Sequence, residues 1–271
     1  MLEFKELEIQ DKSRTDELLH NLSYRLCEYS FGDLFIWRKK YDTKIAFEQD
    51  YMFIKFVAAE NLFYLFPAGS SDKLEKAVRL INEDAVKNGQ ILRIACVTPE
   101  MKVELENIFP DKFDYEIMRD SFDYIYDAND LITLAGRKLH SKRNHISRFE
   151  KLGAWRYEEI TSENIIECEK MSEEWFIVNG SSEDFSLNAE HGAVNQAFKH
   201  YFELGLSGGL IKLEGRIVAF TLGQKLCNDT FIVHIEKAFS DVEGAYTVIN
   251  REFAAHKAVG GSVERFAFAL R

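Results

Sequence analysis

The sequence predicts an α+β fold made of two similar halves. In each half, β-rich runs separated by short polar turns follow one another, which indicates antiparallel hairpins. The helical stripes lie between groups of strands and do not alternate with single strands, so the order does not fit a doubly wound parallel sheet. The chain has 271 residues, enough for two domains of ordinary size. We expect these domains to be residues 1–126 and 127–271.

The first half is expected to contain three helices and a mixed set of strands. Helices are predicted where apolar residues recur at intervals of three and four, at residues 15–26, at a segment ending near Lys87, and at residues 99–108. Strands are predicted from β-branched and aromatic runs at residues 4–9, 31–37, 44–47, 51–57, 62–66, 91–97, 113–118 and 122–126.

The second half is expected to begin with a basic helix and to end with a compact strand–helix unit. Its helices are predicted at residues 137–151, 162–176, 188–204 and 245–256, and its strands at residues 155–160, 210–213, 216–226, 230–238 and 263–270. The turn pairs Glu214-Gly215 and Asn228-Asp229 join the three central strands into an antiparallel meander. Apolar residues at positions 245, 248, 249 and 253 give the last helix an inward-facing stripe.

Composition excludes several classes of protein. The net charge of −11 argues against a generic binder of nucleic acid or of an anionic membrane. No run approaches the roughly 20 apolar residues that span a bilayer, and the first residues lack the layout of a signal peptide. The four cysteines are far apart and form no C-x-x-C pair, which predicts reduced thiols. We therefore expect a cytoplasmic chain without an integral membrane segment, a metal site or a tightly bound cofactor.

One basic segment stands out in this acidic chain. Residues 137–151 contain six Lys or Arg against one Glu, a local charge of +5, while Leu139, Ile146 and Phe149 form a narrow apolar seam at helical spacing. One interpretation is a solvated surface helix. The other is a site for phosphate or carboxylate, because Arg can bind these groups bidentately and Lys binds them as a point charge. The candidate anion-binding residues are Lys142, Arg143 and Asn144, extended by His145 and Arg148.

A second candidate site lies where the last helix begins. Gly244 and Ala245 follow a strand and a short loop, so the backbone N–H groups of the first helical turn would be free to bind an anion or a reacting carbonyl oxygen. The alternative is an ordinary strand–loop–helix corner. We expect this site and the basic segment around Arg143 to border one cavity.

Several segments together resemble a known bacterial family. They are residues 31–37 with Tyr41, residues 124–126 with Leu131, Leu134 and residues 136–138, residues 142–149, residues 234–238, residues 244–246 and residues 249–253. In this combination the chain resembles the family named for the C-terminal domain of phosphatidylglycerol lysyltransferase, over nearly its whole length. The resemblance implies two tandem acyltransferase-like domains of the GCN5-related type, each with a mixed, mainly antiparallel sheet flanked by helices. In membrane enzymes of that family, this domain moves an aminoacyl group from a charged tRNA to a lipid hydroxyl.

Acyl transfer requires a base for the nucleophile, donors for the developing oxyanion and alignment of the two substrates. Glu236 is the first candidate base, and His234, on the same strand face by alternation, is the second. Tyr246 could protonate a leaving group or orient a substrate. Arg251 and Glu252 are expected to support the site from further along the helix. Each of these residues could instead be an exposed or packing residue.

Two departures from the family pattern bear on the reaction. The loop of residues 239–244 has a single glycine, and Glu243 would repel a pyrophosphate, which argues against coenzyme A. The chain also ends differently after the last helix. We therefore expect an acyl- or aminoacyltransferase whose anionic donor is aminoacyl-tRNA or acyl-CoA and whose acceptor is an amine or a hydroxyl. The alternatives are a non-catalytic module that binds tRNA or another anion, and a coenzyme A-dependent N-acetyltransferase.

Overall fold

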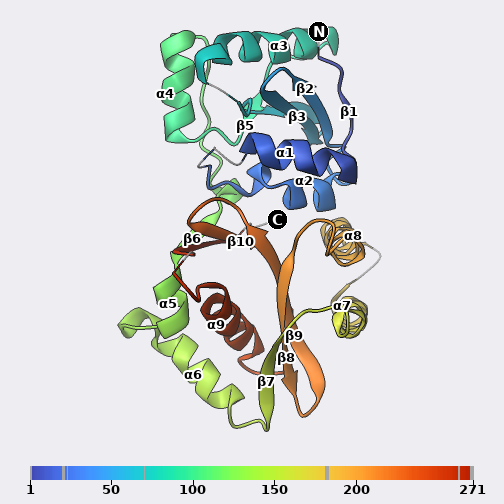
Figure 1. The fold of residues 1–271 in the computed structure, drawn as a ribbon, viewed down its shortest axis with the longest axis vertical. Helices are drawn as coiled ribbons and strands as arrows, with labels where there is room; N and C mark the ends of the chain where they lie inside the picture. The colour runs from blue at the N-terminus through green and yellow to red at the C-terminus, as the bar shows by residue number, and fades with distance from the viewer. Residues whose placement is uncertain are drawn as a thin grey trace. The chain divides into compact units, whose positions relative to one another are not determined.

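The chain forms two compact units, Met1–Ser121 and Phe122–Arg271, in the computed structural model (Figure 1). The structure describes residues 2–19, 22, 24–69, 71–180, 183–261 and 263–268. Each unit has its own mixed sheet with helices on it, so the α+β prediction is confirmed. No helix in the described part of the chain is long and apolar enough to cross a membrane.

The first unit is built on a five-stranded sheet of order β1-β2-β3-β4-β5. Its strands are β1 (Lys5–Glu6), β2 (Lys44–Glu48), β3 (Tyr51–Ala58), β4 (Asn61–Leu65) and β5 (Ile94–Ala95). All neighbours are antiparallel except β4 and β5. The helices are α1 (Lys12–Leu19), α2 (Phe31–Trp37), α3 (Leu74–Lys87) and α4 (Pro99–Ile108), with 3-10 turns η1 (Ile9–Asp11), η2 (Cys27–Tyr29), η3 (Ser71–Lys73) and η4 (Arg119–Ser121).

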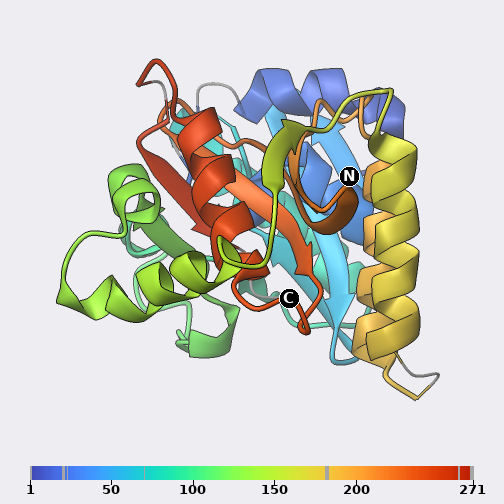
Figure 2. The same cartoon turned by 90° about the horizontal axis from the view of Figure 1, so that it is seen from below.

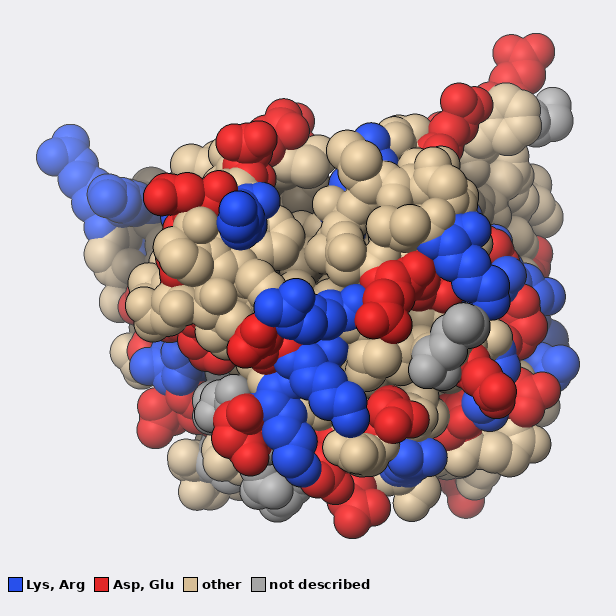
Figure 3. Space-filling view, turned by 90° about the horizontal axis from the view of Figure 1, so that it is seen from above, with Lys and Arg blue, Asp and Glu red and all other residues tan. Residues whose placement is uncertain are grey.

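Helix α3 covers one face of this sheet, and α1 and α2 lie on the other (Figure 1). Ala77, Ile81 and Ala85 of α3 pack against Phe53 and Tyr64 of the sheet, as their helical spacing predicts. The face that carries α3 shows acidic and basic side chains intermixed, with one group of adjoining basic side chains near its centre (Figure 3).

The second unit is built on a six-stranded sheet of order β6-β11-β10-β9-β8-β7. Its strands are β6 (Tyr124–Asp127), β7 (Trp155–Glu159), β8 (Ser207–Leu213), β9 (Arg216–Lys225), β10 (Thr230–Ala238) and β11 (Arg265–Phe268). Only β10 and β11 are parallel. The helices are α5 (Ala128–Thr133), α6 (His140–Phe149), α7 (Ile165–Asn179), α8 (Phe185–Lys199) and α9 (Ala245–Lys257), with the 3-10 turn η5 (Arg137–Leu139) before α6.

Helices α5, α6 and α9 lie on one face of the second sheet, and α7 and α8 on the other (Figures 1 and 2). Val248 and Ile249 of α9 are fully buried with Phe149 of α6 and Ala219 of β9. The predicted stripe of α9 is therefore confirmed, and this packing fixes α6 and α9 against the same strands.

Strand β10 extends past the described part of its parallel neighbour, β11. Residues Thr230 to Val233 pair with β11, whose described part ends at Phe268. A register shift between Val233 and Ile235 leaves His234 as an extra residue relative to β9. The strict alternation expected to place His234 and Glu236 on one face is therefore interrupted by a bulge.

Several predicted elements differ from the observed ones. Residues 31–37 form helix α2 and not a strand, because Ser30 Oγ accepts a hydrogen bond from Asp33 N (3.2 Å) and caps the helix. All seven residues are buried, and a helix that is apolar on every side lacks the periodicity that would have identified it. Residues 113–118 form no strand, and only two residues of the predicted 91–97 strand pair.

Other differences concern the ends of elements. The helix predicted at residues 15–26 corresponds to α1, described to Leu19, and residues 20, 21 and 23 of that prediction lie outside the described residues. The basic helix is split into η5 and α6. The last two residues of the predicted 263–270 strand lie outside the described residues. The expected boundary between residues 126 and 127 falls inside β6. The compact units divide after Ser121 because β6 pairs with β11 of the second sheet.

Candidate functional site

A carboxyl group on β10 faces an amide on α9. Asn250 Nδ2 donates a hydrogen bond to Glu236 Oε2 at 3.3 Å. Burial raises the pKa of Glu236 to about 7, while the Asn250 hydrogen bond and the positive charge of Lys142 act in the opposite direction. A carboxyl with such a pKa can accept and return a proton at neutral pH, as a general base must.

Helix α6 brings positive charge to this carboxyl. Lys142 is exposed, its charge acts on Glu236, and it forms no hydrogen bond or ion pair with another residue in the described ranges. Asn144, also exposed, contacts His140 across 3.3 Å from its Nδ2 to the imidazole Nδ1. The structure therefore places one predicted anion-binding residue near the predicted base.

The Arg143 side chain binds backbone carbonyl groups between α5 and α6. Its guanidinium donates hydrogen bonds to the carbonyl oxygens of Leu134 and of Gly136, the latter at 2.8 Å. These carbonyls follow α5, where a helix end leaves backbone acceptors without intrahelical partners. The guanidinium is thus engaged at the junction of α5 and α6. Its role in anion binding stays a prediction.

Glu243 neutralises another part of the basic segment. Arg148 Nη1 lies 2.5 Å from Glu243 Oε1, and His145 Nδ1 lies 3.9 Å from the same oxygen. Glu243 was expected to repel phosphate at the start of α9. In the structure its charge is paired with α6, and this ion pair links the loop of residues 239–244 to the basic helix.

The start of α9 is in direct contact with α6. Gly244 has φ +86°, and a Cβ atom there would lie 2.3 Å from the carbonyl oxygen of His145 and 3.1 Å from Phe149 Cβ. Glycine is required both by the backbone angle and by this close approach. Ala245 is buried in the same core. The contact joins the two predicted sites by packing, and the cavity expected to be shared between them stays a prediction.

Tyr246 begins α9 beside the end of β10. Burial raises the pKa of its phenol, the backbone of Ala238 opposes the rise, and the carboxylates of Glu236 and Glu190 add to it. Tyr246 is 41% exposed. Tyr246 and Asn250 are four residues apart and therefore lie on the same side of α9. Asn250 contacts Glu236 directly, whereas Tyr246 is influenced by the charge of Glu236 and hydrogen-bonds to the backbone of Ala238 and to Trp175.

A buried cation lies on the opposite face of β10. Lys237 Nζ is 2.7 Å from Glu190 Oε1 and 4.0 Å from the centre of the Trp175 ring. Trp175 Nε1 donates to the carbonyl oxygen of Ala238 at 2.9 Å. These contacts attach α7 and α8 to the end of β10 and fix the backbone next to Tyr246.

Four of these residues were not identified from the sequence: Asn250, Trp175, Lys237 and Glu190. The four-residue spacing from Tyr246 was an available signal for Asn250. The other three come from separate elements, and only the packing of α7 and α8 brings them together. Arg251 and Glu252 form an ion pair with each other (2.6 Å), and their expected supporting role stays a prediction.

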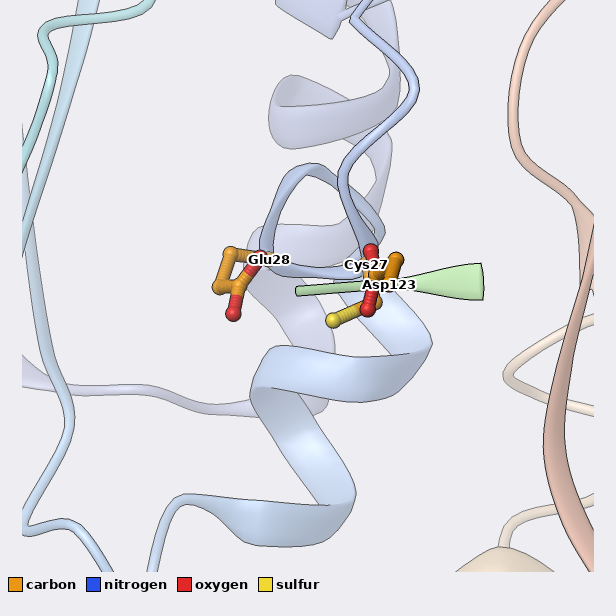
Figure 4. A group of neighbouring side chains, drawn as sticks. All are labelled: Cys27, Glu28 and Asp123. Atoms are coloured by element: carbon orange, nitrogen blue, oxygen red, sulfur yellow. The ribbon is translucent and has the colours of Figure 1, made fainter. Parts of the chain in front are cut away.

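Two potential metal ligands are neighbours in the first unit. Cys27 and Glu28 lie side by side on η2, before α2 (Figure 4). Among the described residues, neither unit by itself contains three His, Cys, Asp or Glu side chains close enough to share an ion.

Several solved structures share this fold over most of the chain. A crystal structure of a conserved protein of unknown function from Bacteroides thetaiotaomicron is 36% identical, with a TM-score of 0.91 over 98% of this chain and 90% of that one. The C-terminal domain of a lysylphosphatidylglycerol synthetase from Agrobacterium fabrum is 13% identical, with a TM-score of 0.67 over 96% and 77%. L-PGS from Bacillus licheniformis is 15% identical, with a TM-score of 0.66 over 98% and 79%. No curated protein matches the chain.

The two distant structures share the fold, and the family model gives the family. The model for the C-terminal domain of phosphatidylglycerol lysyltransferase matches residues 20–270, which is nearly the whole chain. The chain therefore belongs to the family of the phosphatidylglycerol lysyltransferase C-terminal domain, as its sequence motifs predicted.

Proposed function

We propose that the second unit transfers an acyl or aminoacyl group from an activated anionic donor to an amine or hydroxyl, with Glu236 as the general base. The observation that supports this most is the environment of Glu236. Its pKa is raised to about 7, Asn250 binds one of its oxygens, and the positive charge of Lys142 acts on it. General-base catalysis of this kind contributes about 10²–10⁴-fold to rate.

The proposed step conserves atoms and protons. The acceptor O–H or N–H gives its proton to Glu236 as its oxygen or nitrogen attacks the donor carbonyl. The bond between that carbonyl and the leaving group then breaks, and the leaving oxygen or sulfur takes up a proton. We assign this proton to Tyr246, whose phenol is held protonated by a raised pKa and is influenced by the charge of Glu236. The phenolate then takes back a proton from Glu236, directly or through water, which restores both groups.

Aminoacyl-tRNA is the donor we favour. The family is named for a lysyltransferase, and the similar structures include a lysylphosphatidylglycerol synthetase domain. The exposed Lys142 would contact a phosphate of the donor. The close approach of His145 to Gly244 leaves little room for the glycine-rich phosphate loop expected of a coenzyme A enzyme. No tightly bound cofactor is proposed.

A transfer assay tests this function. The full chain would be incubated with tRNA charged with radiolabelled amino acids, together with phosphatidylglycerol vesicles or a diamine, and the acceptor fraction counted. We expect label in one acceptor fraction and a loss of about 100-fold or more in Glu236→Gln. Glu163→Gln, which removes an exposed carboxylate of the same unit, is the matched control and should transfer normally.

Two other outcomes would contradict the proposal and support one of the alternative functions. Saturable binding of aminoacyl-tRNA without transfer to any acceptor would indicate the non-catalytic module. Transfer from acetyl-CoA alone, in a parallel reaction, would indicate the coenzyme A-dependent N-acetyltransferase.

A further inference from the structure

The first unit contains a cavity that the transfer reaction does not use. It has a volume of about 320 Å³, within the range of small-molecule sites. Its walls come from β3, the turn after β4, the start of α3, helix α4 and the segment before η2. The lining residues that matter for its chemistry are Tyr24, Tyr51, Phe66, Gly69, Leu74 and Glu104.

The aromatic wall of this cavity is held firmly in place. Tyr51 is 3% exposed, and Tyr24 packs edge-on against Tyr29 with ring centres 4.7 Å apart. Tyr29 in turn donates from its hydroxyl to the carbonyl oxygen of Phe66 at 2.9 Å. The wall therefore has little freedom to collapse into the hollow, and a ligand would meet aromatic faces already in position.

Glycine shapes one side of the cavity. A Cβ atom on Gly69 would lie 2.6 Å from the carbonyl oxygen of Asp50 and 2.6 Å from the ring of Tyr51. Any larger residue would push the turn away from β3 and change the cavity. Gly69 thus allows the turn to close directly against the Tyr51 ring.

One carboxylate, that of Glu104, lines the cavity, and no Lys, Arg or His is among the described residues that line it. Glu104 of α4 is half-buried, and no Lys, Arg or His of the described residues forms an ion pair with it. Burial raises the pKa of Tyr24 to about 12, and the charge of Glu104 adds to the rise. Burial also raises the pKa of Tyr51 to about 12, with the charge of Asp72 adding most after burial, then Tyr24 and Glu104, and a hydrogen bond from the Lys73 backbone opposing the rise. Both phenols are therefore neutral at physiological pH, and Glu104 is the one charged side chain among the described residues that line the cavity.

We propose that this cavity binds a small organic cation, an ammonium group carried on an apolar body. The ammonium would pair with Glu104 and lie against the faces of Tyr24 and Tyr51, and the apolar body would contact Phe66 and Leu74. Aromatic faces and a carboxylate attract the same sign of charge, so the two features select one class of ligand. The site is separate from the proposed transfer centre, which lies in the second unit.

Calorimetric titration of the full chain with 2-phenylethylamine tests the proposal. The neutral control ligand is 2-phenylethanol, which has the same number of heavy atoms and lacks the charge. We expect saturable binding of the amine at least about 10-fold tighter than that of the alcohol, from one ion pair and one cation–π contact. No saturable binding of the amine, or equal affinity for both ligands, would overturn the proposal.

Variants locate the site. Glu104→Gln should remove the preference for the amine, and Tyr24→Leu should weaken both ligands. Glu83→Gln removes an exposed carboxylate of the same unit on α3, outside the cavity, and should bind as the native chain does. If Glu104→Gln fails to fold by thermal unfolding, Glu104→Asp serves instead, because moving the carboxylate should also weaken the amine. A preference for the amine that survives both the Gln and the Asp changes would defeat the assignment.

Discussion

Asn250 and Glu236 are joined by a hydrogen bond of 3.3 Å between helix α9 and strand β10. This contact lowers the pKa of a carboxyl that burial has raised, and the charge of Lys142 acts in the same direction as the contact, so the value of about 7 results from burial opposed by both. The pair therefore controls the proton affinity of the proposed base.

Asn250→Ala removes the donor and should raise the pKa of Glu236. We expect the acidic limb of the pH–rate profile for transfer to move to higher pH, with activity at neutral pH reduced and activity at alkaline pH nearly retained. The measurement is the rate of label transfer across pH 5–9. Asn195→Ala, an exposed position on α8, is the control. An unshifted limb would show that Asn250 does not act on the base.

Glu236 should also make stability depend on pH. Its pKa is raised from 4.5 to about 7 on folding, so folding favours the protonated form. The contribution is fully present below about pH 4.5 and is lost as the pH rises through about 7. Glu236→Gln should therefore match the native chain at acidic pH and exceed it at pH 8, by at most roughly 3 kcal/mol. Denaturant unfolding at both pH values measures this, and equal stability of the two chains at pH 8 would contradict it.

Arg143→Ala should lower stability before it affects any ligand. The change leaves the carbonyl oxygens of Leu134 and Gly136 without the guanidinium, at a cost of about 1–3 kcal/mol. Thermal or urea unfolding gives the value. Arg137→Ala, on the neighbouring turn, removes an exposed charge and should change stability by less than about 0.5 kcal/mol. Equal effects of the two changes would refute the structural role of Arg143.

Lys142→Gln should weaken donor binding and leave the fold intact. Lys142 is exposed, so unfolding should be unchanged, but a phosphate contact would be lost. If the donor is a tRNA, the slope of log affinity against log salt should fall by about one. Lys138→Gln removes a charge from the same basic segment and is the control for a general effect of charge. An identical loss in both variants would indicate long-range attraction without a specific contact.

Elements whose pattern depends on neighbouring residues can be predicted from the sequence. The turns after Leu213 and Leu226 and the stripe of α9 depend on residues near one another in the chain, and the structure has them. The same reasoning failed at residues 31–37. There the helix is buried on all sides, so its aromatic and branched residues looked like a strand.

The family and the α+β architecture, together with Glu236 as a candidate base, came from the sequence by itself, because motif spacing and periodicity are properties of neighbouring residues. The tertiary structure alone placed Asn250 and Lys142 around that carboxyl. It also engaged Arg143 with the end of α5 and paired Glu243 with Arg148. Hydrogen bonds, ion pairs and burial depend on distances between elements remote in sequence, and those distances are set by how the helices pack on the sheet.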